Sequence, residues 1–201
     1  MVCATYADIL RPQARRLAWL YDLALVLGGS LLVALSARVV FPLPFSPVPV
    51  TAQTLAVLLV GALLGGVRGG MSLLLYLAQG VAGLPVFAAG AAGVAYFLGP
   101  TGGYLLGFVA GATLTGLLAE RGWDRRIWNT LLAMLLGTAV IYAIGLAWLA
   151  LLTGVDDVLA IGLYPFIPGA IVKIVVAAVL LPQGWKLLGH RFEANTRREY
   201  P

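Results

Sequence analysis

The 201-residue sequence predicts an all-α integral membrane protein with six transmembrane helices and a ligand pocket near the external face. Three observations predict this class. The chain is 61% hydrophobic and 10% charged, with a mean hydropathy of +0.97, whereas a soluble domain is about 45–50% apolar and about 25% charged. Its apolar residues fall into six runs. Its basic residues gather between these runs on one side only.

The helices are expected near 19–41, 50–66, 69–83, 102–119, 129–153 and 166–183. The first run is too long for the apolar part of a signal peptide and lacks an A-x-A site, so it should remain as the first helix. The second is short, because Thr51 to Leu64 rises only about 21 Å, against a hydrocarbon core of about 30 Å. Short spans of this kind must extend into their loops.

Small residues spaced by four predict close helix packing in two places. Ser30 and Ala34 form such a pair in the first helix, and Gly107 and Gly111, followed by Thr115, form one in the fourth. Small side chains let helix backbones approach each other in a membrane. The row in the first helix is also the candidate face for docking a partner subunit.

The basic residues predict the orientation of the chain. Eleven of the 13 Lys and Arg residues lie on one side: Arg11, Arg15, Arg16, Arg68, Arg121, Arg125, Arg126, Lys186, Arg191, Arg197 and Arg198. The other side carries only Asp156 and Asp157, and Arg38 and Lys173 fall inside helices. By the positive-inside rule both termini are cytoplasmic. The net charge of +5 therefore reflects membrane topology, and no nucleic-acid partner is expected because no aromatic residues interleave with the charges.

These boundaries divide the chain into three parts. Residues 1–18 form a cytoplasmic segment, 19–183 the transmembrane domain and 184–201 a basic cytoplasmic tail. We expect the protein in the cell membrane, in contact with the lipid bilayer.

The residues needed for catalysis are not placed together. The acidic residues outside the 156–157 pair lie at or beyond the cytoplasmic helix ends, and the single histidine, His190, lies in the tail. The single cysteine, Cys3, excludes an internal disulfide and offers no metal set. "GPTGGY" (99–104) lacks the lysine of a P-loop. We therefore expect neither an enzyme nor a bound cofactor.

The two external loops 41–50 and 83–103 are rich in Pro and Gly and are apolar. Irregular apolar backbone is tolerated at membrane depth where protein buries it or a cavity receives it. We therefore expect these loops to fold over a pocket. Neutral polar residues near the external helix ends could line it: Gln53, Tyr76, Gln79, Thr101 and Tyr104.

Alternative roles remain for several of these residues. Gln53 and Gln79 could instead bridge helices, and Thr101 could cap the fourth helix. Lys173 lies inside the last apolar run, where a charge costs about 2.5–3.5 kcal/mol. It either faces a ligand in the pocket or extends its long side chain to the interface.

Four segments carry a family resemblance: "PLPFSPVPVTAQTLAVLLVGALLG", "LLYLAQGVAGLPVFAAGAAG", "LGPTGGYLLGF" and "PFIPGAIVKI". In this order and spacing, from about residue 30 to 182, they resemble the BioY family of biotin-specific substrate-binding subunits of energy-coupling-factor (ECF) vitamin transporters. The resemblance implies six helices and biotin bound near the external face under the first loop. It also implies two kinds of partner, a transmembrane coupling subunit and a pair of cytoplasmic ATPases that energise uptake.

The family motif P-G-D-x-x-K, whose acid and lysine are implicated in biotin binding, corresponds here to Pro168 through Lys173, with Ala170 in place of the acid. Ala91 and Ala92 stand where some members carry Asn. The candidate substrate-binding residues are Lys173, Gln53, Gln79, Ala91, Tyr96, Tyr104, Ala170 and Arg38. Two other functions remain open: binding of a different small anionic, vitamin-like ligand, and a membrane assembly subunit that binds none.

Overall fold

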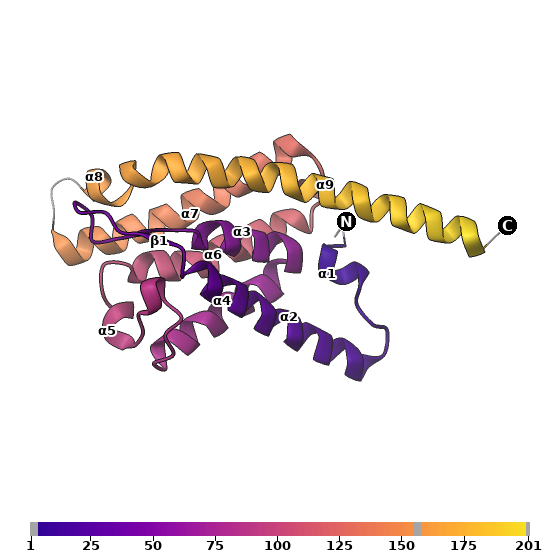
Figure 1. Cartoon of the computed structure of the whole chain (residues 1–201), viewed down its shortest axis with the longest axis horizontal. Coiled ribbons are helices and arrows are strands. Elements are labelled where there is room, and N and C mark those ends of the chain that lie inside the picture. Colours follow the sequence, from indigo (N-terminus) through magenta and orange to yellow (C-terminus); the bar gives the residue numbers. More distant parts are fainter. Residues whose placement is uncertain (1–3, 155–157, 200–201) are drawn as a thin grey trace.

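The computed structural model describes residues 4–154 and 158–199, with side chains up to Leu187 in the last helix. Cys3, Asp156 and Asp157 lie outside the described residues, and so does the side chain of His190. In the described ranges an elongated bundle (Figure 1) contains six helices of 12 residues or more: α2 Arg15–Ser36, α3 Gln53–Leu64, α4 Gly66–Val81, α6 Gly102–Ala119, α7 Ile127–Thr153 and α9 Ile167–Glu199.

Shorter elements connect these helices. A two-stranded antiparallel ladder lies between α2 and α3, with β1 Val40–Phe41 against β2 Val50–Thr51. The others are α1 Tyr6–Ile9, η1 Ala88–Gly90, α5 Val94–Phe97, η2 Trp123–Arg125, α8 Val158–Gly162 and η3 Tyr164–Phe166.

The ladder explains two differences from the expected helix bounds. The first helix ends at Ser36 rather than at 41, because Val40 and Phe41 are extended and pair with the second strand. The same pairing holds Val50 and Thr51, so the next helix begins at Gln53 rather than at 50. Arg38 therefore follows α2 and does not lie inside a helix.

Membrane-spanning length is reached by four helical stretches of the described chain: Arg15–Ser36, Gly102–Ala119, Ile127–Thr153 and Val158–Leu187. Helix α3 is apolar but shorter. Large apolar side chains cover the outside of the long helices, and Leu20, Leu31 and Leu35 on α2 are each more than half exposed. Such a surface suits contact with lipid.

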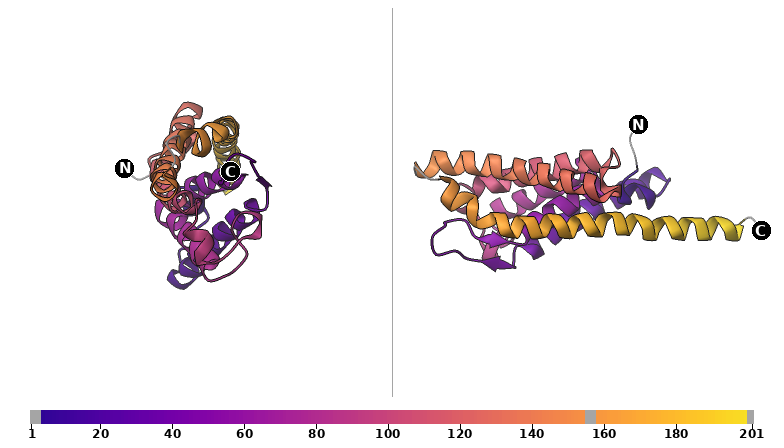
Figure 2. Two further views of the ribbon diagram at one scale, coloured as in Figure 1. Left: turned by 90° about the vertical axis from the view of Figure 1, so that its left-hand side faces the viewer. Right: turned by 90° about the horizontal axis from the view of Figure 1, so that it is seen from above.

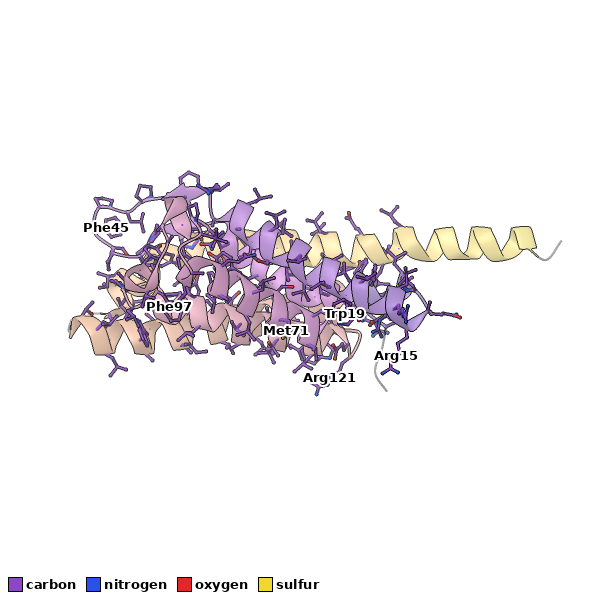
Figure 3. All side chains as sticks on the ribbon, turned by 90° about the horizontal axis from the view of Figure 1, so that it is seen from below. Arg15, Trp19, Phe45, Met71, Phe97 and Arg121 are labelled. Carbon is purple, nitrogen blue, oxygen red and sulfur yellow. The ribbon has the colours of Figure 1, made fainter. Side chains whose placement is uncertain are left out.

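Helix α9 is continuous beyond the expected end at 183, passing through Pro182 and reaching Glu199. Its last turns project past the bundle at the end where α1 also lies (Figure 2). Figure 3 shows Arg15 and Arg121 toward this same end, and Phe45 and Phe97 toward the opposite end. We call these the terminal end and the loop end.

Small residues allow close packing of α6 on α7, as expected for Gly107 and Gly111. A Cβ added at Gly107 would lie 2.8 Å from the carbonyl oxygen of Ile141, and one at Gly111 would lie 2.7 Å from the Ile141 side chain. A larger side chain at Gly107 would therefore collide with the backbone of α7, and one at Gly111 would collide with the Ile141 side chain.

The small-residue row of α2, which is the expected docking face, is largely buried in the isolated chain. Ser30 is 0% exposed and Ala34 is 8% exposed. The Ser30 hydroxyl donates to Oε1 of Gln79 on α4 at 2.7 Å. This row is therefore used for packing within the chain, and its role in docking a partner stays a prediction.

Candidate functional site

A cavity of about 520 Å³, including its opening, lies at the loop end of the bundle. The first loop, α3, the 88–101 segment, α6, α7, η3 and α9 all contribute to its lining: Val48, Pro49, Thr51, Gln53, Thr54, Ala88, Tyr96, Thr101, Tyr104, Leu105, Phe108, Tyr142, Phe166 and Lys173.

Lys173 is the charged residue of this lining. It lies in the second turn of α9, which starts at Ile167 immediately after η3. Its Nζ donates to the carbonyl oxygen of Thr51 at 2.5 Å and to Oγ1 of Thr54 at 2.8 Å. Both acceptors are neutral, so the ammonium is hydrogen-bonded without being paired to a carboxylate.

Aromatic rings form one wall of the cavity. Tyr104, Tyr142 and Phe166 come from α6, α7 and η3, and each pair has ring centroids 6.4 Å apart. The Tyr104 hydroxyl donates to the carbonyl oxygen of Gly162 at 2.7 Å, which fixes the ring. An apolar ring system of a ligand could pack against this wall.

Tyr96 also lines the cavity and belongs to a second aromatic group behind the lining. Tyr96 stacks on Phe87 with centroids 5.4 Å apart, and Phe87 meets Tyr76 edge-on at 5.6 Å. Nε2 of Gln53 donates to the Tyr76 hydroxyl at 2.6 Å. Gln53 thus bridges α3 and α4 and also lines the cavity, and its contact with a ligand stays a prediction.

The apolar loops fold over the cavity. Val48 and Pro49 of the first loop line it, and Val48 is buried. The Ser46 hydroxyl donates to the carbonyl oxygen of Ile161 at 2.7 Å and joins this loop to α8. On the other side, Gly93 N–H donates to the carbonyl oxygen of Gly80 at 2.8 Å. Both loops are therefore held against the bundle at the cavity.

Four of the predicted site residues meet in this cavity: Lys173, Gln53, Tyr96 and Tyr104. The other four lie elsewhere. Gln79 accepts the hydrogen bond from Ser30. Ala91 lines an open groove outside the cavity, and Ala170 lines an apolar groove between α7 and α9. Arg38 is exposed and donates to the carbonyl oxygen of Pro85 at 2.7 Å.

Sequence reasoning missed Thr51, Thr54, Tyr142 and Phe166. Thr51 and Thr54 flank Gln53 in "TAQT", and their polar side chains in an apolar stretch are a signal that could have indicated the site. Tyr142 and Phe166 lie among other apolar residues, and nothing in the sequence distinguishes a cavity-facing aromatic ring from a lipid-facing one.

The carboxylates of the described chain lie away from the cavity. At the terminal end, Arg68 contacts Asp8 and Asp22 at 2.8 Å each. Asp124 is 2% exposed and accepts a hydrogen bond from Nε1 of Trp185 at 2.5 Å. Burial raises the pKa of Asp124 and outweighs that hydrogen bond. For Asp8, burial acts in the same direction, but hydrogen bonds from Thr5 and Arg68 outweigh it and lower the pKa.

These features define an all-helical, multi-pass membrane protein with a loop-covered cavity, and its fold is that of an S-component. The crystal structure of the S-component for biotin from an ECF-type ABC transporter matches with a TM-score of 0.77 and 26% sequence identity, over 87% of this chain and 95% of that one. The chain belongs to the BioY family, whose model matches residues 11–190.

Two curated relatives carry the name of the same family. The biotin transporter BioY of Rhizobium etli is 40% identical over 168 residues, which cover 79% of this chain and 90% of the relative. The biotin transporter BioY of Rhodobacter capsulatus is 40% identical over 168 residues, covering 77% and 87%. These relatives are transporters, as expected for a chain that is not an enzyme.

Proposed function

We propose that this chain is the high-affinity biotin-binding subunit of an ECF vitamin uptake transporter. The observation that carries the proposal is the cavity itself, in which one ammonium and a few neutral polar groups converge between aromatic walls. Biotin has an apolar fused ring, a ureido group and a carboxylate. Such a ligand needs apolar walls, convergent polar groups and one cation.

Ala170 and Ala91 stand where relatives carry polar residues, and each lines a groove that shares a tyrosine with the cavity, Tyr142 for Ala170 and Tyr96 for Ala91. Both residues lie outside the cavity, in separate grooves.

The proposal includes a topology and partners. Six helices cross the cell membrane, with the shorter α3 and α4 extending into their loops. Both termini are cytoplasmic and the cavity opens outward, an orientation that the basic residues of the terminal end favour. Without a nucleotide motif in the sequence, concentrative uptake requires a transmembrane coupling subunit and a pair of cytoplasmic ATPases.

Equilibrium binding of labelled biotin to the purified, detergent-solubilised chain tests the proposal. We expect saturable binding that unlabelled biotin displaces and that an unrelated vitamin carboxylate does not. Biotin that fails to bind saturably, or that another small anion displaces equally well, would contradict it.

A further inference from the structure

We infer that Thr54 is a positioning residue for the ligand. Together with the carbonyl oxygen of Thr51, it holds the Lys173 ammonium in the cavity without neutralising it. This inference rests on the proposed function and assigns a role to a residue outside the motif that carries the lysine. It starts from the two hydrogen bonds that Nζ donates, at 2.5 Å to Thr51 O and at 2.8 Å to Thr54 Oγ1.

The charge of the ammonium is not cancelled by a partner. In the described part of the chain, every salt bridge lies at the terminal end and joins Arg11 or Arg68 to Asp8 or Asp22. The two neutral oxygens satisfy two of the three N–H donors of a lysine. The third donor and the full positive charge are left for a polar or anionic group of the ligand, and such charge-assisted hydrogen bonds are the stronger kind.

Thr54 is suited to hold the lysine because of where it lies. It is in the first turn of α3, lines the cavity itself and contacts a residue 119 positions later in the chain. A lysine side chain has many rotamers, and fixing it before binding lowers the entropy lost when the ligand binds. Ala170, one turn before Lys173, contributes to a different groove and cannot take over this role.

The alternative is a lysine that extends to the membrane interface. Such a residue places its ammonium in water and needs no fixed partner. Lys173 instead is half-buried and bonded to two oxygens of one segment. The two roles predict different behaviour when the Thr54 hydroxyl is removed.

The test is a double-mutant cycle with labelled biotin on the purified full-length chain. It uses the parent, Thr54→Val, Thr54→Ser, Lys173→Met and the double variant Thr54→Val/Lys173→Met. We expect Thr54→Val, which keeps the shape of the side chain, to weaken binding about 10- to 100-fold, and Thr54→Ser to restore most of it. The double variant should bind no more weakly than Lys173→Met alone, because Thr54 acts through the lysine.

A matched control is Thr113→Val on α6. The Thr113 hydroxyl donates to the carbonyl oxygen of Val109 at 2.8 Å, and this residue does not line the cavity. Its variant should bind biotin as the parent does. Thr54→Ala provides a second removal of the hydroxyl, and thermal unfolding of each variant verifies that it is folded.

The outcomes separate this inference from the proposed function. Tight binding by the parent together with unchanged binding by Thr54→Val and Thr54→Ala overturns the role of Thr54 only. Fully additive losses in the double variant also overturn it, since Thr54 would then act apart from Lys173. A parent that does not bind biotin overturns both.

Discussion

Lys173 carries a charge into an apolar helix, and the structure explains how that charge is tolerated. A charge at the centre of a membrane helix costs about 2.5–3.5 kcal/mol. Hydrogen bonds to Thr51 and Thr54 offset part of this cost. Because both acceptors are neutral, the positive charge of Lys173 is not balanced by them. It can therefore interact with an anionic or polar group of a bound ligand.

Gln53 lines the cavity and donates a hydrogen bond to Tyr76, which is buried behind it. The amide lies 2.6 Å from the hydroxyl, and the two residues are 3% and 0% exposed. Tyr76→Phe leaves the amide without this acceptor, which should cost about 1–3 kcal/mol of folding stability. Thermal unfolding in detergent measures this as a lower melting temperature. The exposed Tyr164 provides the control, and equal losses in Tyr76→Phe and Tyr164→Phe would contradict the account.

Some of these residues could be predicted from the sequence. Lys173 and Gln53 are polar groups within apolar runs, where they are costly and therefore informative. Tyr142 and Phe166 could not be predicted, because an aromatic ring is equally at home against lipid or in a cavity. Gln79 is as polar as Gln53, but only the packing of α2 on α4 reveals that Ser30 bonds to it.

The helices themselves follow from apolar runs, whereas their ends do not. The end of α2 and the start of α3 are set by the pairing of Val40 with Thr51, a contact between residues whose sequence shows no alternating pattern. Helix α9 continues past Pro182 to Glu199, and its last part contains Leu, Lys, Arg, Glu and Ala, which are good helix formers. An apolar run alone cannot indicate that continuation.

Close packing of α7 on α6 shapes the aromatic wall. A Cβ at Gly145 would lie 2.4 Å from the ring of Tyr104, whereas one at Gly28 would meet nothing within 4 Å. Gly145→Ala should therefore push Tyr104 into the cavity, weaken biotin binding by at least about tenfold and cost about 1–3 kcal/mol of stability. Gly28→Ala serves as the control and should leave biotin binding unchanged. Parent-like binding by Gly145→Ala would show that the wall can adapt.

The two ends of the molecule differ in chemistry, with the cavity at the loop end and ion pairs at the terminal end. Phe45 and Arg121 mark these ends (Figure 3) and are both exposed. In a Cys3→Ala background, Phe45→Cys should react with a membrane-impermeant maleimide on intact cells. Arg121→Cys should react only after permeabilisation. The reverse pattern would contradict the proposed orientation.

The terminal end should also respond to pH, with two carboxylates acting in opposite directions. Burial raises the pKa of Asp124, so its stabilisation is present below the unfolded pKa of about 3.9 and is lost as the pH rises through the folded value. The pKa of Asp8 is lowered, so its stabilisation is present above that pH and is lost as the pH falls.

Melting temperatures between about pH 2 and pH 7 test this pair. Relative to the parent, Asp124→Asn should become more stable as the pH rises, because the parent alone must ionise a buried group. Asp8→Asn should become less stable relative to the parent in a lower interval, as the pH rises from the lowered folded pKa of Asp8 to its unfolded pKa of about 3.9, and the difference should then stay constant. Curves that run parallel to that of the parent would refute both assignments.

The central claim is that the cavity binds biotin through Lys173, and an equilibrium titration of biotin tests it most directly. The parent, Lys173→Met and the exposed Lys186→Met are compared under one condition. Lys173→Met should remain folded but lose about 2–5 kcal/mol of binding free energy, the range for removing one partner of a buried charged pair. Lys186→Met should bind as the parent does. Binding by Lys173→Met that is as tight as that of the parent would contradict the account.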